Sequence, residues 1–325
     1  MTVNVNLVTL ALVDVLVIGA GVSGLTTAVC LAEAGYAVRV CATRLPRDTT
    51  SCAAGALWGP YLVEEDNRVE RWSFETRLAL ELLHGAGVGV RLVRGIEAAR
   101  STVEPPSWAT TLDGFAVCRP DELPSGYASG WWYRAPIVDM PSYLDYLARR
   151  LTAAGGKVEI GVVTSLDEAT TQAPIAVNCT GSGARTLVPD TEVTPISGQL
   201  VVVDNPGIEH FFAEYGHGPE LTYIFPHGDN VVLGGTALPG RSDTTPDPVA
   251  AAAIMRRCAA VEPRLAEARI RDVRVGVRPS RPMVRLECVE MAGRHLIHNY
   301  GHGGSGVTLS WGCARDVLAI VNELA

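Results

Sequence analysis

The sequence predicts an α/β protein, α+β overall, in which a doubly wound parallel part is interleaved with a part built on a mixed, largely antiparallel sheet. Three observations lead to this prediction. A strand, a glycine turn and a helix pattern follow one another between residues 14 and 41. Helix and strand patterns alternate again after residue 141, and two apolar strands flank a turn near residue 227.

The first unit is a strand, a turn and a helix. Residues 14–19 form a short run rich in β-branched side chains, and residues 25–34 carry apolar side chains at helical spacing. Residues 37–41 have the pattern of a second strand. Two strands that enclose a helix in this way pair in parallel, so these residues predict a βαβ unit.

The later elements fall into two kinds of region. Residues 46–139 are rich in Pro, Gly and Trp, whereas the alternation of helices and strands returns after them. The turn His227-Gly228-Asp229-Asn230 predicts an antiparallel hairpin. The predicted helices cover 70–83, 142–154 and 313–324, and the predicted strands cover 157–163, 176–179, 199–204, 221–225, 231–235, 273–286 and 295–300. We therefore predict one domain from residues 1–55, 141–195 and 273–325, and a second from residues 56–140 and 196–272.

Charge and hydropathy limit the partners. The 325 residues include 27 basic and 35 acidic side chains, and the formal net charge of −8 argues against nucleic acids and anionic membranes, which need a concentrated positive field. The longest apolar stretch, residues 7–20, is interrupted by Asp14 and is shorter than the roughly 20 residues that span a membrane. No Lys or Arg precedes it, as one would in a secretory signal. We expect a cytoplasmic protein that acts on small molecules.

No metal site is expected. The eight cysteines occur singly, and no Cys/His cluster has the spacing of a zinc site. His295, His298 and His302 do not form an HExxH motif, because Asn299 stands where the Glu would be needed and Gly301 would break the helix.

A glycine motif lies at the turn of the predicted βαβ unit. In Gly19-Ala20-Gly21-Val22-Ser23-Gly24, the first glycine permits a tight turn, the second allows the backbone to approach a pyrophosphate, and the third allows close packing of helix and strand. An acidic residue for a ribose hydroxyl is expected about 20 residues further on, but Thr43 and Arg44 stand there. Because Arg44 suits the 2′-phosphate of NADP, this motif alone leaves both FAD and NADP open.

Two more glycine segments favour a flavin. Thr180 and Gly181 follow a predicted strand, and residues 301–306 precede the last helix. The free N–H groups at the start of that helix would stabilise negative charge on the N1–C2=O side of a reduced isoalloxazine ring.

Arg285 and Tyr223 are candidates for substrate binding. Arg285 lies between Val284 and Leu286, where a buried guanidinium would need an anion. A substrate carboxylate and the neighbouring Glu287 are equally good partners on sequence alone. Tyr223 lies in a predicted hairpin strand, where a tyrosine is more often a core residue than a ligand.

Several motifs resemble the D-amino-acid oxidase family. Residues 298–306 and 311–314 are similar to its C-terminal signature, residues 49–51, 53–55 and 57–61 to its loop against the flavin, and residues 223–226 and 284–287 to its substrate-binding segments. The resemblance implies a Rossmann-like FAD-binding domain and a substrate domain, with FAD held non-covalently. The implied cofactor contacts, together with Gly19, Gly21, Val22, Ser23, Gly24, Arg44, Thr180 and Gly181, are Thr49, Thr50, Ser51, Ala54, Gly55, Leu57, Gly301, Gly303, Gly304, Gly306, Val307 and Thr308.

The resemblance also implies the reaction. A D-amino acid would be oxidised by hydride transfer from Cα to flavin N5, and the imino acid would be hydrolysed to a 2-oxo acid and ammonia. Dioxygen would reoxidise the flavin and yield hydrogen peroxide. Arg285 would bind the substrate carboxylate, Tyr223 would donate a further hydrogen bond to it, and the Gly304 carbonyl would accept one from the amine.

The substrate side chain is expected to be neutral and apolar. Relatives that act on D-aspartate place an Arg after Gly-Gly-Thr, whereas Ala237 follows Thr236 here, and Leu57 and Gly59 would leave room for an apolar group. The alternatives are a glycine or sarcosine oxidase, an NADP-dependent reductase that uses Arg44, and a flavin-binding protein without turnover. The sequence leaves a homodimer open.

Overall fold

The structure, a computed structural model, describes residues 13–64, 66–216, 218–291 and 293–325. The first part of the apolar stretch over residues 7–20 therefore lies outside the described residues. Within the described ranges, no helix has the length and apolar character needed to cross a membrane.

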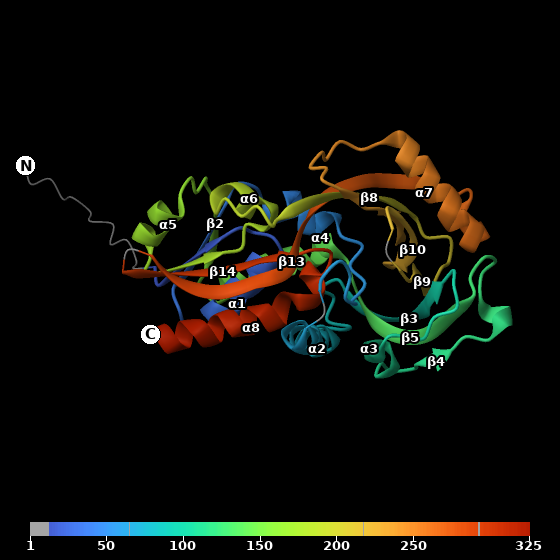
Figure 1. Cartoon of the computed structure of the whole chain (residues 1–325), viewed down its shortest axis with the longest axis horizontal. Coiled ribbons are helices and arrows are strands. Elements are labelled where there is room, and N and C mark those ends of the chain that lie inside the picture. The colour runs from blue at the N-terminus through green and yellow to red at the C-terminus, as the bar shows by residue number, and fades with distance from the viewer. Residues whose placement is uncertain (1–12, 65, 217, 292) are drawn as a thin grey trace, which may run out of the picture.

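A parallel sheet forms one end of the molecule (Figure 1). Its strand order is β14-β7-β1-β2-β6, with all four neighbouring pairs parallel. The strands are β14 (Arg294–His302), β7 (Ile175–Asn178), β1 (Val15–Ile18), β2 (Val38–Ala42) and β6 (Lys157–Ile160). The predicted βαβ unit is confirmed, since β1 and β2 enclose helix α1 (Val22–Glu33).

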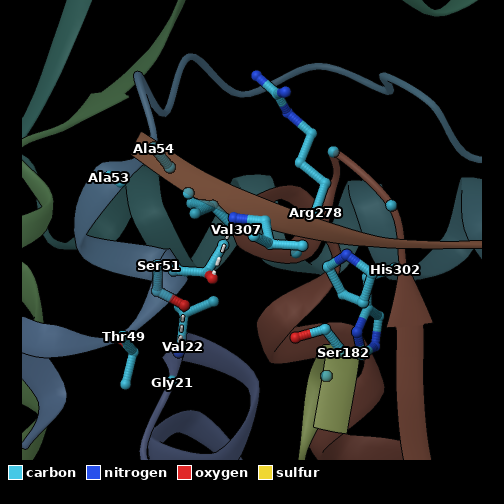
Figure 2. A pocket seen from close by; sticks show the side chains of 18 of the residues that line it. Gly21, Val22, Thr49, Ser51, Ala53, Ala54, Ser182, Arg278, His302 and Val307 are labelled. Carbon is cyan, nitrogen blue, oxygen red and sulfur yellow. Dashed lines mark hydrogen bonds between the residues drawn. The ribbon is translucent and has the colours of Figure 1, made fainter. Parts of the chain in front are cut away.

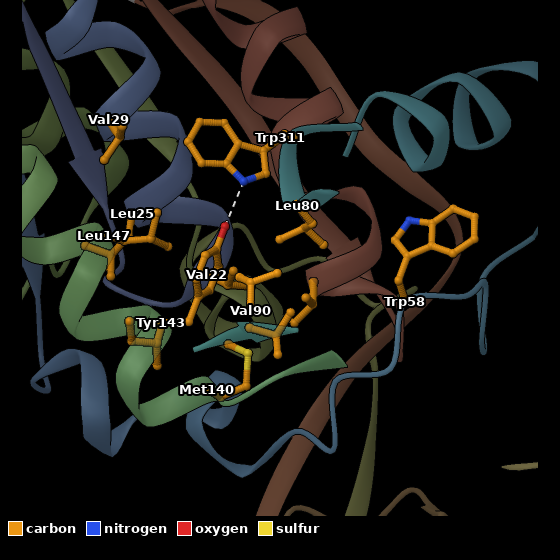
Figure 3. Close-up of a cluster of buried hydrophobic side chains, with 14 of the residues drawn as sticks. Val22, Leu25, Val29, Trp58, Leu80, Val90, Met140, Tyr143, Leu147 and Trp311 are labelled. Atoms are coloured by element: carbon orange, nitrogen blue, oxygen red, sulfur yellow. Dashed lines mark hydrogen bonds between the residues drawn. The ribbon is translucent and has the colours of Figure 1, made fainter. Parts of the chain in front are cut away.

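Helices cover both faces of this sheet because the strand side chains alternate. Val15 and Val17 pack into the same core as α1, α4 (Met140–Ala153) and α8 (Gly306–Leu324), whereas Leu16 and Ile18 pack with α5 (Leu166–Gln172). In the first core, the Trp311 Nε1 group donates a hydrogen bond of 2.7 Å to the Tyr143 hydroxyl, so that α8 and α4 are fixed to each other (Figure 3). Helix α2 (Asn67–Leu82) packs against α8.

A mixed, mostly antiparallel sheet forms the other end. Its order is β4-β5-β3-β9-β10-β11-β8-β13, in which only β3 and β9 pair in parallel. The strands are β4 (Ala116–Val117), β5 (Ser129–Val138), β3 (Val90–Ala99), β9 (Phe211–Glu214), β10 (Glu220–Pro226), β11 (Asn230–Thr236), β8 (Thr194–Asp204) and β13 (Ile270–Met291), and β12 (Leu238–Pro239) pairs with β8. The predicted hairpin is β10 and β11. Helix α7 (Pro248–Val261) packs on this sheet, α3 (Ser107–Thr110) lies near it, and α6 (Ala184–Leu187) belongs to the parallel part.

Strand β13 joins the two sheets. It pairs with β8 from Ile270 to Ser280 and with β14 from Ser280 to Met291, and the register of the β13–β14 pairing shifts between Ser280 and Arg285. One long strand therefore contributes side chains to two different environments. The predicted fold class is confirmed, while the exact division into two domains stays a prediction.

Candidate functional site

A cavity of about 1480 Å³ extends between the two sheets, from the turn after β1 to Tyr223 on β10. Ordinary small-molecule sites measure roughly 300–1,000 Å³. The cavity is therefore large enough for an extended cofactor together with a small substrate. Figure 2 shows several of its lining residues.

The turn between β1 and α1 forms one end of the cavity. Gly19 has φ 111°, and a Cβ there would lie 2.5 Å from the Cys179 carbonyl oxygen. A Cβ on Gly24 would lie 2.0 Å from the Gly19 carbonyl oxygen, so this glycine permits close packing of helix and turn. Helix α1 begins without a side-chain cap on Gly21 and without an acidic residue in its first turn. Its N-terminal N–H groups and dipole thus fit a pyrophosphate.

Ser51 links this turn to the next segment of the wall. The Val22 N–H group donates a hydrogen bond of 2.9 Å to the Ser51 Oγ atom (Figure 2). Ser51 belongs to the short 3₁₀ helix Thr50–Ala53, which packs against β13 through the bond from the Val277 N–H group to the Thr50 hydroxyl. The segment over residues 49–57 is therefore held between the turn that precedes α1 and strand β13.

The start of α8 forms the far side of the cavity. The Ser305 hydroxyl accepts a hydrogen bond from the Tyr61 N–H group at 2.7 Å and donates one to the Tyr61 carbonyl oxygen at 2.9 Å. A Cβ on Gly304 would lie 2.4 Å from the Tyr61 ring, so only glycine fits there. The first turn of α8 borders the cavity and carries no acidic residue. This arrangement suits the electron-rich edge of a reduced flavin.

Nearly all the predicted cofactor contacts line this cavity. Gly24 and Gly301 do not: Gly24 packs against Gly19, and a Cβ on Gly301 would meet the Arg281 side chain. Arg44, predicted as a cofactor contact, lies there beside Thr43 at the end of β2. The residues that do line it are Gly19, Gly21, Val22, Ser23, Arg44, Thr49, Thr50, Ser51, Ala54, Gly55, Leu57, Thr180, Gly181, Gly303, Gly304, Gly306, Val307 and Thr308. Their roles toward a cofactor stay a prediction.

Arg285 does not lie where the sequence analysis placed it. It is absent from the cavity wall, and its guanidinium donates to Glu287 at 2.7 Å and to the Tyr300 hydroxyl at 2.8 Å. The Asp190 carboxylate lies 3.7 Å from its Nη1 atom. The assignment of Arg285 to a substrate carboxylate stays a prediction, and the surroundings of its guanidinium give it no support. Its charge is neutralised by internal carboxylates, one of them the Glu287 that the sequence offered as the alternative.

Arg278 occupies the cavity instead. It lies on the part of β13 that pairs with β8, and its Nη1 atom donates a hydrogen bond of 3.1 Å to the Thr236 carbonyl oxygen. Figure 2 shows its side chain reaching away from Ser51 and Ser182. No carboxylate in the described parts of the chain forms an ion pair with it, although the side chain is half-buried. A half-buried guanidinium without an internal anion is a binding site for an external one.

Two tyrosines stand beside Arg278. Burial raises the pKa of Tyr223 to about 12, although the Arg278 charge acts in the opposite direction. Burial also raises the pKa of Tyr61, whose ring centre lies 5.8 Å from the Arg278 guanidinium carbon. Both hydroxyls are therefore protonated at neutral pH and can donate hydrogen bonds. The Tyr223 ring stacks on Phe225 and lies over Gly234, where a Cβ would be 1.7 Å from the ring.

His298 and His302 have internal hydrogen-bond partners, and His302 also borders the cavity. His302 is buried, its Nε2 atom lies 3.0 Å from the Asn299 side-chain oxygen, and burial lowers its pKa to about 4. Burial likewise lowers the pKa of His298 to about 4. In the described ranges no group of His, Cys, Asp and Glu side chains is arranged to hold a metal ion, and all eight cysteines are free.

The outer wall of the cavity was not predicted from the sequence. Glu97 on β3 and Tyr133 on β5 line it, together with Trp108 and Tyr215. Strands β3, β5 and β9 were not predicted, because glycine and proline interrupt the alternation of β3 and β5, and β9 is only four residues long. A carboxylate between apolar residues near the end of a strand, as in Ile96-Glu97-Ala98, is the signal that would have drawn attention to Glu97.

Comparisons with known proteins agree with this geometry. Residues 14–319 match the family described as FAD dependent oxidoreductase. The chain is 47% identical to a D-amino-acid oxidase from Rubrobacter xylanophilus over 310 residues, which cover 94% of each chain. It is 45% identical to a D-amino-acid oxidase from Streptomyces coelicolor over 314 residues, which cover 95% of this chain and 97% of the relative.

The fold itself is shared more widely. The structure of glycine oxidase from Geobacillus kaustophilus superimposes with a TM-score of 0.82 at 20% identity and covers 95% of this chain and 94% of that one. Such a low identity shows the fold alone. The family match decides between the two nucleotides that the glycine motif left open, in favour of FAD. The chain thus belongs to the D-amino-acid oxidase family of FAD-dependent oxidoreductases.

Proposed function

We propose that the protein oxidises D-amino acids with neutral side chains to 2-oxo acids, with release of ammonia and hydrogen peroxide. The observation that carries this proposal is the half-buried Arg278, which faces the cavity beside Tyr223 and has no carboxylate partner in the described chain. The names of the two D-amino-acid oxidase relatives support the same activity.

Different residues of the cavity would bind different groups of the substrate. Arg278 would bind the substrate carboxylate with charge-assisted hydrogen bonds, and the Tyr223 hydroxyl would donate another. The Gly304 carbonyl would accept a hydrogen bond from the substrate amine. FAD, held non-covalently by the residues around α1 and α8, supplies when bound an acceptor for the hydride from Cα, and dioxygen reoxidises it with formation of hydrogen peroxide.

Orientation accounts for the catalysis. No acid or base is needed at Cα if the carboxylate and the amine are both fixed, because the Cα–H bond is then aimed in one direction. The L-isomer, bound by the same two groups, would point this hydrogen away. The protein therefore provides stereoselectivity through three fixed substituents rather than through a proton-transferring side chain.

An anaerobic titration tests the proposal. The purified holoenzyme is mixed with D-alanine, D-methionine or D-phenylalanine, and bleaching of the visible flavin absorption is followed. We expect bleaching with the D-isomers, none with the L-isomers, and release of hydrogen peroxide when air is admitted. Faster bleaching with glycine or N-methylglycine, or a colourless protein that binds NADPH, would contradict it. The homodimer is tested separately by the mass of the holoenzyme in solution.

A further inference from the structure

Glu97 is an acidic side chain in the wall of the cavity that the proposed reaction does not use. It lies on β3, in register with Ala213 on β9, which is in turn in register with Tyr223 on β10. Residues in register point to the same face of a sheet, and adjacent strands are about 4.8 Å apart. The carboxylate therefore faces the same cavity as Tyr223, at a distance of about two strand spacings, or roughly 10 Å.

The carboxylate of Glu97 is held in place by only one of its oxygens. The Trp131 Nε1 group and the Tyr133 hydroxyl both donate to Oε2, at 3.2 and 3.3 Å. Within the described ranges, no group donates to Oε1 and no Lys or Arg forms an ion pair with Glu97. The residue lines the cavity, so Oε1 is an acceptor that a ligand can reach.

Aromatic side chains line the part of the cavity around Glu97. Trp108 packs edge-on against Tyr133 at a centroid distance of 5.9 Å, and Tyr215 packs edge-on against Trp131 at 5.2 Å. Trp108, Tyr133 and Tyr215 line the cavity together with Glu97. Aromatic faces suit an apolar stem and attract a cationic group, and a carboxylate beyond them suits the charged end of a long side chain.

We propose that Glu97 is a specificity-determining residue whose free oxygen binds the amino or guanidino group of a basic substrate side chain, such as that of D-lysine or D-arginine. This inference rests on the proposed function, since it requires the α-carboxylate to be bound at Arg278. The flexible four-carbon stem of lysine then points its ammonium group along the aromatic wall toward the free oxygen of Glu97.

The test compares D-lysine with D-norleucine, which has the same stem and lacks the ammonium group. The ratio of their kcat/KM values isolates recognition of the charge, because both substrates share the α-carboxylate, the α-amine and the reaction. We expect the substitution Glu97→Gln to lower this ratio about tenfold or more, as for loss of a charge-assisted contact. Glu97→Asp, which keeps the charge, should retain part of the preference.

Glu122→Gln is the matched control. The Glu122 carboxylate accepts a hydrogen bond of 3.2 Å from the Trp132 Nε1 group, the same kind of contact as that between Glu97 and Trp131, but it does not border the cavity. This variant should leave the ratio unchanged. An equal fall in both variants would show that the carboxylates act through the stability of the sheet, and the subsite would be wrong.

A pH series on the unmodified holoenzyme gives a second measurement that needs no variant. Burial raises the pKa of Glu97 to about 7, against the opposing effect of the hydrogen bonds from Trp131 and Tyr133. The charged groups around it are few: burial raises the pKa of Tyr133 well above its usual range, and Glu214, one position beyond Ala213 on β9, is paired with Arg100. The ratio should therefore rise between about pH 6 and pH 8, as Glu97 ionises.

The outcomes separate the two proposals. If D-norleucine is oxidised and D-lysine is not, or if the ratio is the same in Glu97→Gln at every pH, the subsite is wrong and the proposed function stands. If neither compound nor any other D-amino acid is oxidised, the proposed function itself fails. Retention of the visible flavin spectrum in each variant shows that the cavity is intact.

Discussion

Arg278 and Arg285 lie on the same strand, seven residues apart, and have different surroundings. Arg278 belongs to the half of β13 that pairs with β8 and faces the cavity without an anion. Arg285 belongs to the half that pairs with β14, where Glu287, Asp190 and the Tyr300 hydroxyl surround its guanidinium. The difference shows that an arginine available for a ligand is recognised by the absence of an internal carboxylate rather than by apolar neighbours in sequence.

Removing each guanidinium in turn tests which of the two arginines binds the substrate, and we expect the largest effect here. Arg278→Ala should lower kcat/KM for D-methionine by about two to three orders of magnitude, because a desolvated, charge-assisted contact is worth about 2–5 kcal/mol. Most of this loss should appear as a higher KM. Arg285→Ala should change kcat/KM less than about threefold, since the group does not reach the cavity. Steady-state kinetics with equal flavin content decide, and a larger effect in Arg285→Ala would reverse the assignment.

A second substitution displaces the Arg278 side chain without removing its charge. A Cβ at Gly198 would lie 1.9 Å from the Arg278 Nη1 atom, and the backbone of Gly198 needs no positive φ. Gly198→Ala should therefore push the guanidinium out of its position and lower kcat/KM by about one order of magnitude, because misplacement of a binding group is costly. The matched control is Gly218→Ala, which does not border the cavity and whose nearest contacts would be an ordinary 4.0 Å from the Glu220 carbonyl oxygen and the Leu221 side chain. Similar kinetics in the two variants would mean that the position of Arg278 is not critical.

The two tyrosines that accompany the arginines extend the comparison. Tyr223→Phe removes a protonated hydroxyl from the cavity and should raise KM about threefold to tenfold, the value of one hydrogen bond of about 1 kcal/mol. Tyr300→Phe removes the hydroxyl that donates to Asp190 at 2.7 Å, and it should lower the thermal midpoint with KM unchanged. A change of KM in Tyr300→Phe, measured at full flavin occupancy, would mean that the groups around Arg285 also affect substrate binding at Arg278.

Local patterns predicted those parts of the molecule that local physics determines. The β-branched run before Gly19 and the helical spacing after it predict the glycine turn between β1 and α1. The turn at 227–230 predicts the hairpin that carries Tyr223. The glycine motifs predicted most of the cavity wall, because at these positions a neighbouring part of the chain comes so close that only glycine fits. Each of these features depends on neighbours within a few residues along the chain.

The remainder depends on contacts between distant residues. Arg278 faces the cavity from the part of β13 that pairs with β8, whereas Arg285 lies where β13 pairs with β14, beyond a register shift in that pairing between Ser280 and Arg285. Glu97 faces the cavity only because β3 pairs with β9, from a segment more than 100 residues away. No periodicity in the sequence encodes such pairings, so neither Arg278 nor Glu97 was singled out from the sequence.

The smallest effect on turnover is expected at Asp190, which is the internal partner that makes Arg285 structural. Burial alone would raise the pKa of this carboxyl, but hydrogen bonds from Tyr300 and the Glu192 N–H group and the charge of Arg281 hold the pKa below its ordinary value. A depressed pKa stabilises the fold above the pKa of the unfolded chain, and this contribution is lost as the pH falls through the folded value. Asp190→Asn should therefore lower the free energy of unfolding by about 2–3 kcal/mol at pH 7.

The difference between wild type and Asp190→Asn should narrow below about pH 4, where the carboxyl of the unfolded chain begins to take up its proton, and should be lost below the lower pKa of the folded protein. Denaturant unfolding at pH 7 and at low pH measures it, and kcat/KM at pH 7 should stay near the wild-type value because Asp190 does not line the cavity. A stability difference that is independent of pH would mean that Asp190 acts through packing rather than charge. Packing would then hold Asp190 and Arg285 in place. The remaining difference between the two arginines would be that Arg278 lines the cavity and Arg285 does not.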